Sequence, residues 1–258
     1  ARMGGSVAML SAIGDDHMGA GAKAHLEDLG VDVSMIETKR NRTSAIYLSI
    51  LNDKNDMELA ISDMDVVKYI LPDILDRNAR ALAAAKVIAI DGNLERETIE
   101  YAAKKFSGIP LFFDPVSTPK AVRAADVIGS FTCVKPNVME AEVLSGIRIE
   151  SEADLKRAGQ WFIDKGVKKV FITLNKDGVY YKDKDEEGFI RPGRVIVNSA
   201  TGAGDSFSAA ILMGMASGME IKDIARYGMA AAQITMESRH AVNQYMCKEE
   251  IERRIKNV

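Results

Sequence analysis

The run Asn198-Ser-Ala-Thr-Gly-Ala-Gly-Asp-Ser-Phe207 contains residue types that can bind a phosphate and deprotonate a hydroxyl. Thr201-Gly-Ala-Gly204 is a turn of small residues that leads into an apolar helix, so its backbone can approach a ligand closely. A helix start presents unpaired N–H groups and roughly half a positive charge, and phosphate is its usual anion. Asp205 lies one residue inside this helix, where it could accept a proton from a hydroxyl that attacks the γ-phosphate of ATP. Such general-base help contributes roughly 10²–10⁴ in rate.

A simple helix N-terminus is the alternative explanation of Asp205, because acidic residues stabilise many first turns. The apolar run Val195-Ile-Val197 precedes the motif, however, and has the composition of a strand. A strand, a small-residue turn and an apolar helix in succession favour the phosphate-binding interpretation.

Further polar groups follow predicted strands. Asn137 and Glu140 come after residues 131–134, and their spacing is also that of a helix capping box. Asp91-Gly-Asn93 and Asp114-Pro-Val-Ser-Thr-Pro-Lys120 follow two other strands. Ordinary turn chemistry and an exposed lysine are the alternatives for these two runs. Because ligands of parallel α/β sheets lie beyond the carboxyl ends of the strands, we expect these residues to form the polar floor of a ligand site.

The segments that must position these groups alternate between strand and helix, which indicates a mostly parallel sheet covered by helices on both faces. Strands are predicted over 7–13, 31–36, 86–91, 109–114, 131–134 and 169–174. Helices are predicted over 16–29, 72–85, 94–106, a short stretch from 138, 151–165, 204–216, 221–237 and 248–256. Two hairpins are predicted, one joining 43–51 to 57–61 through a turn at 52–56 and one joining 178–182 to 188–192.

Composition narrows the class of protein. The chain has 258 residues, 47% of them hydrophobic and 28% charged, which suits one sizeable α/β domain. A net charge of −3 argues against a nucleic-acid partner, and no apolar run approaches the roughly 20 residues of a membrane span. Cys133 and Cys247 form no disulfide pattern and are expected to be free thiols in a reducing cytoplasm. A nicotinamide-dependent dehydrogenase is disfavoured because no G-x-G-x-x-G follows a first strand.

Ser199-Ala-Thr-Gly-Ala-Gly-Asp205 resembles the D-T-x-G-A-G-D signature of the ribokinase-like (PfkB) carbohydrate kinases. The resemblance implies a three-layer αβα sandwich with a mostly parallel central sheet and a small β lid. It implies Asp205 as the catalytic base, an anion hole formed by Gly202, Ala203 and Gly204, and ATP with Mg²⁺ as cofactors. Ser199 departs from the family's aspartate, which often helps to hold a monovalent cation, so dependence on such a cation stays open.

Two motifs resemble the nucleotide side of the family. Asn137-x-x-Glu140 matches the N-x-x-E motif that organises Mg²⁺ and phosphate, which implies an indirect metal role for Glu140. Thr173-Leu-Asn-Lys-Asp-Gly178 occupies the place of T-x-G-x-x-G, with Asn175 replacing the first glycine. Asparagine tolerates a left-handed backbone, so the turn is expected to survive. The predicted nucleotide-binding residues are Lys135, Asn137, Glu140, Thr173, Asn175, Gly178 and Thr201.

The acceptor side is expected near the lid. Ala12-Ile-Gly-Asp-Asp16, with Gly19 three residues on, resembles the family's G-D-D-x-x-G segment and supports the fold. The run 43–61 would form the lid, within about residues 32–62, and closure would exclude water as a competing acceptor. The predicted acceptor-binding residues are Thr43, Ser44, Asp91, Asn93, Asp114 and Lys120.

Three strings resemble those of the pseudouridine kinase subgroup: Phe113-Asp-Pro-Val-Ser117, Glu58-Leu-Ala-Ile-Ser-Asp-Met-Asp65 and Val134-Lys-Pro-Asn-Val-Met-Glu-Ala-Glu-Val-Leu-Ser-Gly146. They imply conversion of pseudouridine to its 5′-phosphate. Ribose, fructose and ordinary nucleosides are the alternative acceptors. A sensor on the same fold that binds a nucleoside without turnover is a further alternative, although the retained Asp205 and glycines favour an enzyme.

The chain opens Ala1-Arg2-Met3-Gly4-Gly5 and enters a predicted strand at Val7. Family members normally begin with a further strand and helix, which carry an acceptor-binding aspartate and a Gly-Gly turn. The resemblance therefore implies one ribokinase-like kinase domain over residues 1–258 that lacks this first strand and helix, and we expect the natural protein to be longer. Lid-mediated dimers among relatives imply a homodimer by analogy.

Overall fold

The central sheet contains six strands in the order β10-β9-β8-β7-β6-β5. The structure, a computed structural model, describes residues 1–51, 57–193 and 197–256. Strands β5 to β8 run parallel, whereas β9 and β10 add an antiparallel hairpin at one edge. The strands are β5 Ile88–Asp91, β6 Leu111–Asp114, β7 Cys133–Val134, β8 Lys169–Thr173, β9 Val179–Lys182 and β10 Glu187–Ile190.

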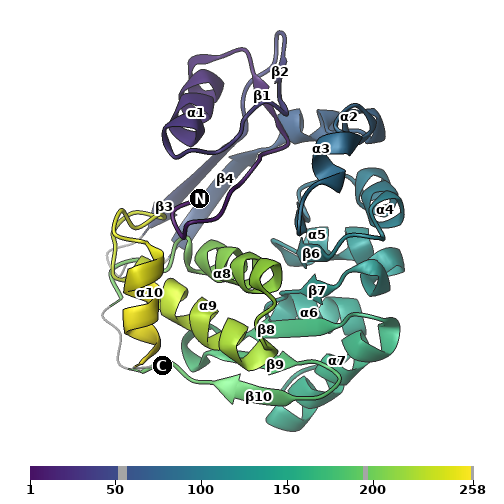
Figure 1. The fold of residues 1–258 in the computed structure, drawn as a ribbon, viewed down its shortest axis with the longest axis vertical. Coiled ribbons are helices and arrows are strands. Elements are labelled where there is room, and N and C mark those ends of the chain that lie inside the picture. Colours follow the sequence, from purple (N-terminus) through teal and green to yellow (C-terminus); the bar gives the residue numbers. More distant parts are fainter. Residues whose placement is uncertain (52–56, 194–196, 257–258) are drawn as a thin grey trace.

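Two neighbouring residues of β6 explain why helices cover both faces of the sheet. Successive side chains of a strand point to opposite faces. Phe113 packs in the cluster that includes residues of α4, α6 and α7, whereas Phe112 packs with residues of α8 and α9. Each ring is at most 2% exposed, so both faces of the strand need an apolar cover. The sheet is thus the middle layer of an αβα sandwich (Figure 1), which confirms the predicted fold class.

The helices of the two layers follow the strands that they cover. The first layer contains α4 Arg96–Lys105, α5 Thr118–Ala121, the 3₁₀ segment η2 Val122–Ser130, α6 Val138–Ser145 and α7 Glu152–Lys165. The second contains α8 Ala203–Ser217 and α9 Ile221–Met236, and α10 Lys248–Ile255 packs against α9. Within the described ranges, none of the helices has both the length and the apolar character that crossing a bilayer requires.

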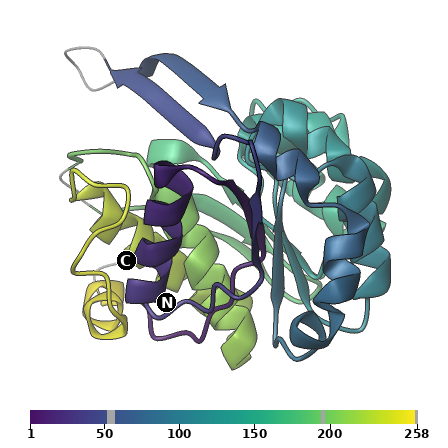
Figure 2. The same ribbon diagram turned by 90° about the horizontal axis from the view of Figure 1, so that it is seen from above.

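The N-terminal part forms two smaller sheets. β1 Ser11–Gly14 and β2 Ile36–Lys39 pair in parallel, with α1 His17–Asp28 between them in sequence. β3 Ile46–Leu51 and β4 Met57–Asp63 form an antiparallel hairpin that projects from the body, as Figure 2 shows. This hairpin lies in the segment that the sequence predicts to be the lid, and we call it the lid below. The 3₁₀ segment η1 Asp65–Tyr69 and the helices α2 Pro72–Arg77 and α3 Ala79–Ala83 lead from the lid to β5.

Several predicted boundaries were wrong for local reasons. The predicted strand at 31–36 is largely a turn, because the Asp32 carboxylate accepts the Ser34 N–H at 2.9 Å, and β2 begins only at Ile36. The predicted helix at 72–85 breaks at Asn78, whose side chain donates to the Ile74 carbonyl at 2.8 Å. The predicted strand at 7–13 is confined to β1, apart from an isolated bridge at Ala8.

Two predicted elements fall on residues that the structure leaves undescribed. The hairpin turn at 52–56 lies outside the described residues, as do the first two residues of the strand-like run at 195–197, and Val197 lies in no strand. Within the expected lid range of about 32–62, β3 and β4 form the projecting hairpin, whereas β2 pairs with β1 in the body.

Candidate active site

Gly202 shapes the turn that begins α8. Its φ of 83° lies in the left-handed region, and a side-chain Cβ there would lie 2.0 Å from the Ala241 carbonyl oxygen. Only glycine satisfies both conditions. Gly202 is the N-cap residue, and its carbonyl accepts the Ser206 N–H at 2.9 Å to close the first turn. The helix start therefore lies where the sequence predicts an anion hole, and its unpaired backbone N–H groups are of the type that binds anions.

Asp205 is the third residue of α8 and is exposed to solvent at the mouth of this turn. The protein around it nevertheless removes part of its hydration, which raises the pKa of the carboxyl above its ordinary value. The Asp114 carboxylate raises that pKa further and Asp91 adds to the effect, whereas Lys135 opposes it. A carboxylate with a raised pKa is a stronger base than a free one.

Asp114 connects the end of β6 to α8 and to β7. Its Oδ2 lies 3.1 Å from the Lys135 Nζ and accepts the Ser208 hydroxyl at 2.7 Å. Ser208 lies one turn after Gly204, to whose carbonyl it also donates at 3.1 Å. Lys135 is buried, with 8% of its side chain exposed, and its Nζ lies 3.9 Å from the Cβ position of Gly204. The lysine charge is therefore held beside the first turn of α8.

Sequence reasoning missed the strain at Val116. A β-branched residue rarely adopts a positive φ, yet that of Val116 is 67°. The Asp114 Oδ1 accepts the Val116 N–H at 3.2 Å, which holds the loop in this conformation. Strained backbone of this kind clusters at functional sites. Nothing in the sequence identifies it, because valine gives no signal for a left-handed turn.

The loops after β5 and β6 lie side by side, since Asp91 and Asp114 are paired in the sheet register. Asp91 accepts from the backbone and side-chain nitrogens of Asn93 at 2.8 and 3.1 Å, and the Asn93 Oδ1 accepts from the Lys120 Nζ at 2.5 Å. Gly92 allows the close approach, because a Cβ there would lie 2.3 Å from the Pro115 carbonyl oxygen. The prediction did not include Gly92, although its place in an Asp-Gly turn was a signal.

Asn137 and Glu140 form the capping box of α6. The Glu140 N–H donates to the Asn137 Oδ1 at 2.9 Å, and the Asn137 N–H donates to the Glu140 Oε2 at 2.8 Å. Glu140 is 3% exposed, and this burial raises the pKa of its carboxyl despite the Asn137 N–H and the Lys135 charge. The capping role and a nucleotide role are compatible, as expected from the sequence.

Carboxylates are sparse around the start of α6 in the described part of the chain. Among the described residues, no three His, Cys, Asp or Glu side chains are grouped to hold a metal ion. Magnesium usually keeps several waters and needs only one or two protein carboxylates, so the indirect metal role expected of Glu140 stays a prediction.

The loop after β8 lies beside the start of α6. Thr173 forms an isolated parallel bridge with Asn137, and its N–H donates to the Pro136 carbonyl at 3.0 Å. Asn175 has a φ of 52°, which confirms that asparagine maintains the left-handed turn there. A Cβ on Gly178 would lie 2.0 Å from the Ile190 carbonyl oxygen, so this position needs glycine. Thr201 is exposed just before α8, and its N–H donates to the Ser199 hydroxyl.

Ser44 and Thr43, the two acceptor-binding residues predicted just before β3, differ in their exposure to solvent. The Ser44 side chain is 5% exposed; its hydroxyl accepts the Gly14 N–H at 3.0 Å and donates to the Asp16 Oδ1 at 2.7 Å. It is thus engaged within the protein rather than open toward an acceptor. The neighbouring Thr43 is exposed, and its hydroxyl lies 3.5 Å from the Asp63 Oδ2. Its predicted role in acceptor binding stays a prediction.

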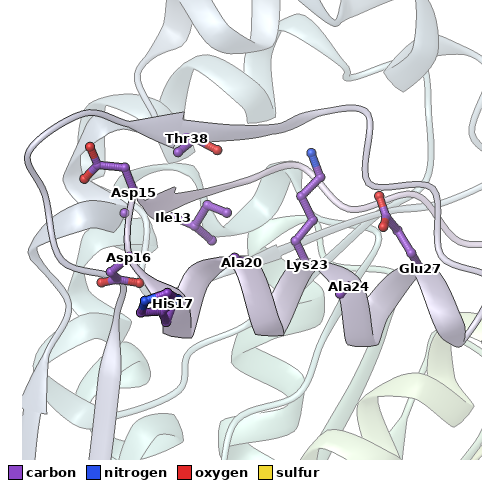
Figure 3. Close-up of a pocket in the computed structure, with 10 residues that line it drawn as sticks. Ile13, Asp15, Asp16, His17, Ala20, Lys23, Ala24, Glu27 and Thr38 are labelled. Carbon is purple, nitrogen blue, oxygen red and sulfur yellow. The ribbon is translucent and has the colours of Figure 1, made fainter.

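A cavity of about 610 Å³ lies between α1 and the β1–β2 sheet. Figure 3 shows Asp15 and Asp16 at one end, with Lys23 and Glu27 along the helix. None of the residues predicted for nucleotide or acceptor binding lines it. The candidate active site is instead formed where Asp91, Asp114 and Lys135 follow the carboxyl ends of parallel strands, as expected for this architecture.

Known proteins resemble this chain over most of its length. A model of the pfkB family carbohydrate kinases matches residues 1–246. Pseudouridine kinase of Escherichia coli (strain K12) is 30% identical over 244 residues, which cover 94% of this chain and 78% of that protein. A candidate sugar kinase from Clostridium perfringens has a solved structure with a TM-score of 0.88 at 31% identity, covering 99% of this chain and 81% of that one. A candidate ribokinase II from E. coli, solved in complex with ATP and Mg²⁺, has a TM-score of 0.85 at 20% identity over 100% and 85% of the two chains, which shows the shared fold.

Proposed function

The chain belongs to the pfkB family of carbohydrate kinases, and from this premise we propose that it transfers the γ-phosphate of ATP to a hydroxymethyl group of a nucleoside or sugar. The acceptor that we propose is pseudouridine, and the product is pseudouridine 5′-phosphate. The observation that carries this proposal is the position of Asp205 in the first turn of α8, beside the Gly202 turn and the Lys135 charge.

In the proposed reaction the acceptor oxygen attacks the γ-phosphorus while its proton passes to the Asp205 carboxylate. The bond from the γ-phosphorus to the bridging oxygen breaks, and ADP leaves with that electron pair. The N–H groups at the start of α8 and the Lys135 ammonium face the negative charge that spreads over the phosphoryl oxygens. The raised pKa of Asp205 supports its role as the base.

Magnesium and ATP belong to the same proposal. The E. coli relative solved with ATP and Mg²⁺ supports both at the level of the family. In this chain we assign Lys135, Asn137 and Glu140 to the phosphate and metal side, and Thr173, Asn175, Gly178 and Thr201 to the remainder of the nucleotide. When bound, Mg²⁺ would neutralise charge on the β- and γ-phosphates. Asn137 and Glu140 would orient water and phosphate around it, since their own bonds already fix their side chains.

Pseudouridine is favoured over other acceptors by the 30% identity to the E. coli enzyme and by the strings at 58–65, 113–117 and 134–146. Asp91, Asn93 and Lys120, linked by hydrogen bonds, are the proposed polar floor for the acceptor. Ribose, fructose and other nucleosides are the second choice, because the same floor would suit any sugar with several hydroxyls.

A panel assay tests the acceptor directly. ADP release by the protein is measured with pseudouridine, uridine, adenosine, ribose and fructose at equal concentrations, with ATP and Mg²⁺ present. We expect the highest kcat/KM with pseudouridine. Turnover with fructose or ribose alone would replace the proposed acceptor and leave the kinase assignment standing. Addition of K⁺ to the same assay decides whether Ser199 has removed the cation dependence.

We also propose that the lid mediates a homodimer and that the protein works in the cytoplasm. Ile46, Leu48, Ile50, Leu59 and Ile61 are all exposed on the lid, and their strand positions and register place them on one face. An apolar face of this kind suits a second copy of the same surface. Light scattering on the wild type and on Leu48→Glu tests this: a dimer mass that falls to a monomer mass supports it, and a wild-type monomer contradicts it.

A further inference from the structure

The loop after β1 forms a receptacle for the first residues of the lid. We call Gly14, Asp15, Asp16 and Gly19 the socket, and residues 42–44, just before β3, the lid root. The socket residues lie at the start of α1, where Figure 3 shows Asp15 and Asp16. The lid root is about 25 to 30 residues away in sequence, so the contact between the two is a tertiary one.

Both glycines of the socket make room for the lid root. A Cβ on Gly14 would lie 2.2 Å from the Arg42 carbonyl oxygen and 2.6 Å from the Ser44 backbone nitrogen. A Cβ on Gly19 would lie 2.4 Å from the Ser44 hydroxyl oxygen. Real Cβ atoms do not approach so closely, so the two positions admit only glycine while the lid root is seated.

Asp16 bonds the lid root to the body with both carboxylate oxygens. Its Oδ2 accepts the Ser44 N–H at 2.7 Å, and its Oδ1 accepts the Ser44 hydroxyl and the Gly19 N–H, each at 2.7 Å. These bonds lower the pKa of the carboxyl to about 2, with the Ser44 N–H as the largest cause, so the group stays ionised at any working pH. Asp15 adds one bond, accepting the Asn41 N–H at 3.0 Å.

The orientation of the lid depends on these bonds, because the hairpin itself has little packing. Among the described residues, none of the side chains of β3 or β4 belongs to the buried core. At the other end of the hairpin, the Asp63 carboxylate accepts the Asp65 N–H at 3.1 Å, and the next two residues, Val66 and Val67, are buried against Ala12 of β1. Both ends of the lid thus lead to the β1 region, and at the lid root the link to the body is the Asp16 carboxylate.

We propose that Asp16 is a positioning residue that seats the lid root, and with it Thr43, for closure over the acceptor. This inference rests on the proposed kinase function. The carboxylate does not touch the reacting atoms; it acts through Ser44. Loss of the seat would therefore impair acceptor binding and the exclusion of water, while binding of ATP at α8 and α6 would be retained.

The main test is Asp16→Asn, with Asp32→Asn as the matched control. An amide nitrogen cannot accept a hydrogen bond, so Asp16→Asn loses at least one of the bonds to Ser44 or Gly19. We expect KM for the acceptor to rise about tenfold, as the loss of one charge-assisted hydrogen bond predicts. We expect KM for ATP to change less than about twofold, and the fraction of ATP hydrolysed without phosphorylation of acceptor to rise. Asp32 caps a surface turn through the Ser34 N–H, so its replacement removes the same kind of bond away from the lid.

Ser44→Ala provides a milder variant that retains the backbone bond to Asp16. Its effect on acceptor KM should be smaller than that of Asp16→Asn. In the double variant, the free-energy change calculated from acceptor KM should be less than the sum of the two single changes, because both substitutions act on one contact. If Asp16→Asn lowers only the melting temperature and leaves acceptor KM and the hydrolysed fraction unchanged, Asp16 is merely the cap of α1 and the inference is wrong.

Failure of the proposed function gives a different result. If the wild type phosphorylates no acceptor in the panel, the proposed kinase function is wrong. The contact between Asp16 and the lid root is then tested by amide hydrogen exchange at residues 46–48. Faster exchange there in Asp16→Asn but not in Asp32→Asn supports the proposal that Asp16 positions the lid root. Equal exchange in both variants overturns it, whatever the protein phosphorylates.

Discussion

The proposed nucleotide side of the candidate active site and the lid are held by opposite kinds of contact. Around α8, Asp114 binds Lys135 and Ser208 at once, Gly202 lies against the Ala241 carbonyl, and the surrounding side chains are largely buried. The lid hairpin, by contrast, exposes its apolar side chains and is joined to the body at its two ends. Groups that stabilise transferred charge need a fixed geometry before the substrate arrives. A cover that admits the acceptor and then excludes water needs freedom to move.

Among the substitutions that test this difference, Asp205→Asn should have the largest effect on activity. Removing the proposed base should lower kcat by about 10²–10⁴-fold, whereas KM for ATP should stay close to that of the wild type. ADP release and product formation, measured under saturating substrates, check this. If kcat falls less than tenfold, a group other than Asp205 accepts the proton. The reacting groups would then not all lie at the start of α8.

Gly202→Ala should disturb the turn that begins α8, and Gly218→Ala, at the other end of the same helix, is its control. Both glycines have a positive φ, of 83° and 69°, but a Cβ on Gly202 meets the Ala241 carbonyl whereas one on Gly218 meets nothing within 4 Å. Backbone strain alone costs about 1–3 kcal/mol in each variant. Only Gly202→Ala should also raise KM for ATP. If both variants have the same KM for ATP, the backbone conformation at the start of α8 is not needed for nucleotide binding.

Asp114→Asn should shift the pH dependence of the reaction. The Asp114 charge raises the pKa of Asp205, so its removal lowers that pKa, and the base stays ionised to lower pH. The acidic limb of the kcat/KM profile therefore moves toward lower pH. Ser208→Ala removes a hydrogen bond to Asp114 but leaves the charge, so its limb should not move even if kcat falls. Identical profiles for Asp114→Asn and the wild type would show that Asp114 does not act on the base.

The smallest expected effect is on stability. Partial loss of hydration raises the pKa of Asp205 in the folded protein. Between the ordinary and the raised pKa, the folded state therefore binds more protons than the unfolded state. The ionised group is therefore unfavourable to folding above that window. Asp205→Asn should raise Tm slightly at neutral pH, and this gain should disappear in acid, where both states are protonated. Calorimetry at two pH values checks the sign.

The local parts of the site could be predicted from the sequence because their causes are local. Small residues before an apolar helix identify the α8 turn, the Asn137 and Glu140 spacing gives the capping box, and Asn175 has the left-handed φ that its residue type allows. The layers of the fold followed from strand and helix alternation.

The missed parts depend on contacts between distant residues. Ser208 meets Asp114 across 94 residues, and Ser44 meets Asp16 across 28, so neither spacing carries a signal. A polar serine before a lid strand is expected to face solvent or ligand; here three hydrogen-bonding groups of the socket compensate for its burial. Val116 was invisible because its strain is imposed by Asp114 rather than favoured by its own residue type.

The contact between Gly202 and Ala241 links the stretch between α9 and α10 to the proposed phosphate site. Met236 and Glu237 reinforce the tie, since their carbonyls accept from the Asn198 backbone and side-chain nitrogens at 2.8 Å each. Insertions between α9 and α10 would thus perturb the start of α8, where we propose that phosphate binds, although they lie far from it in sequence. In diverging homologues, a larger side chain at position 202 could be accommodated only where this connecting stretch has withdrawn, so the two places should co-vary.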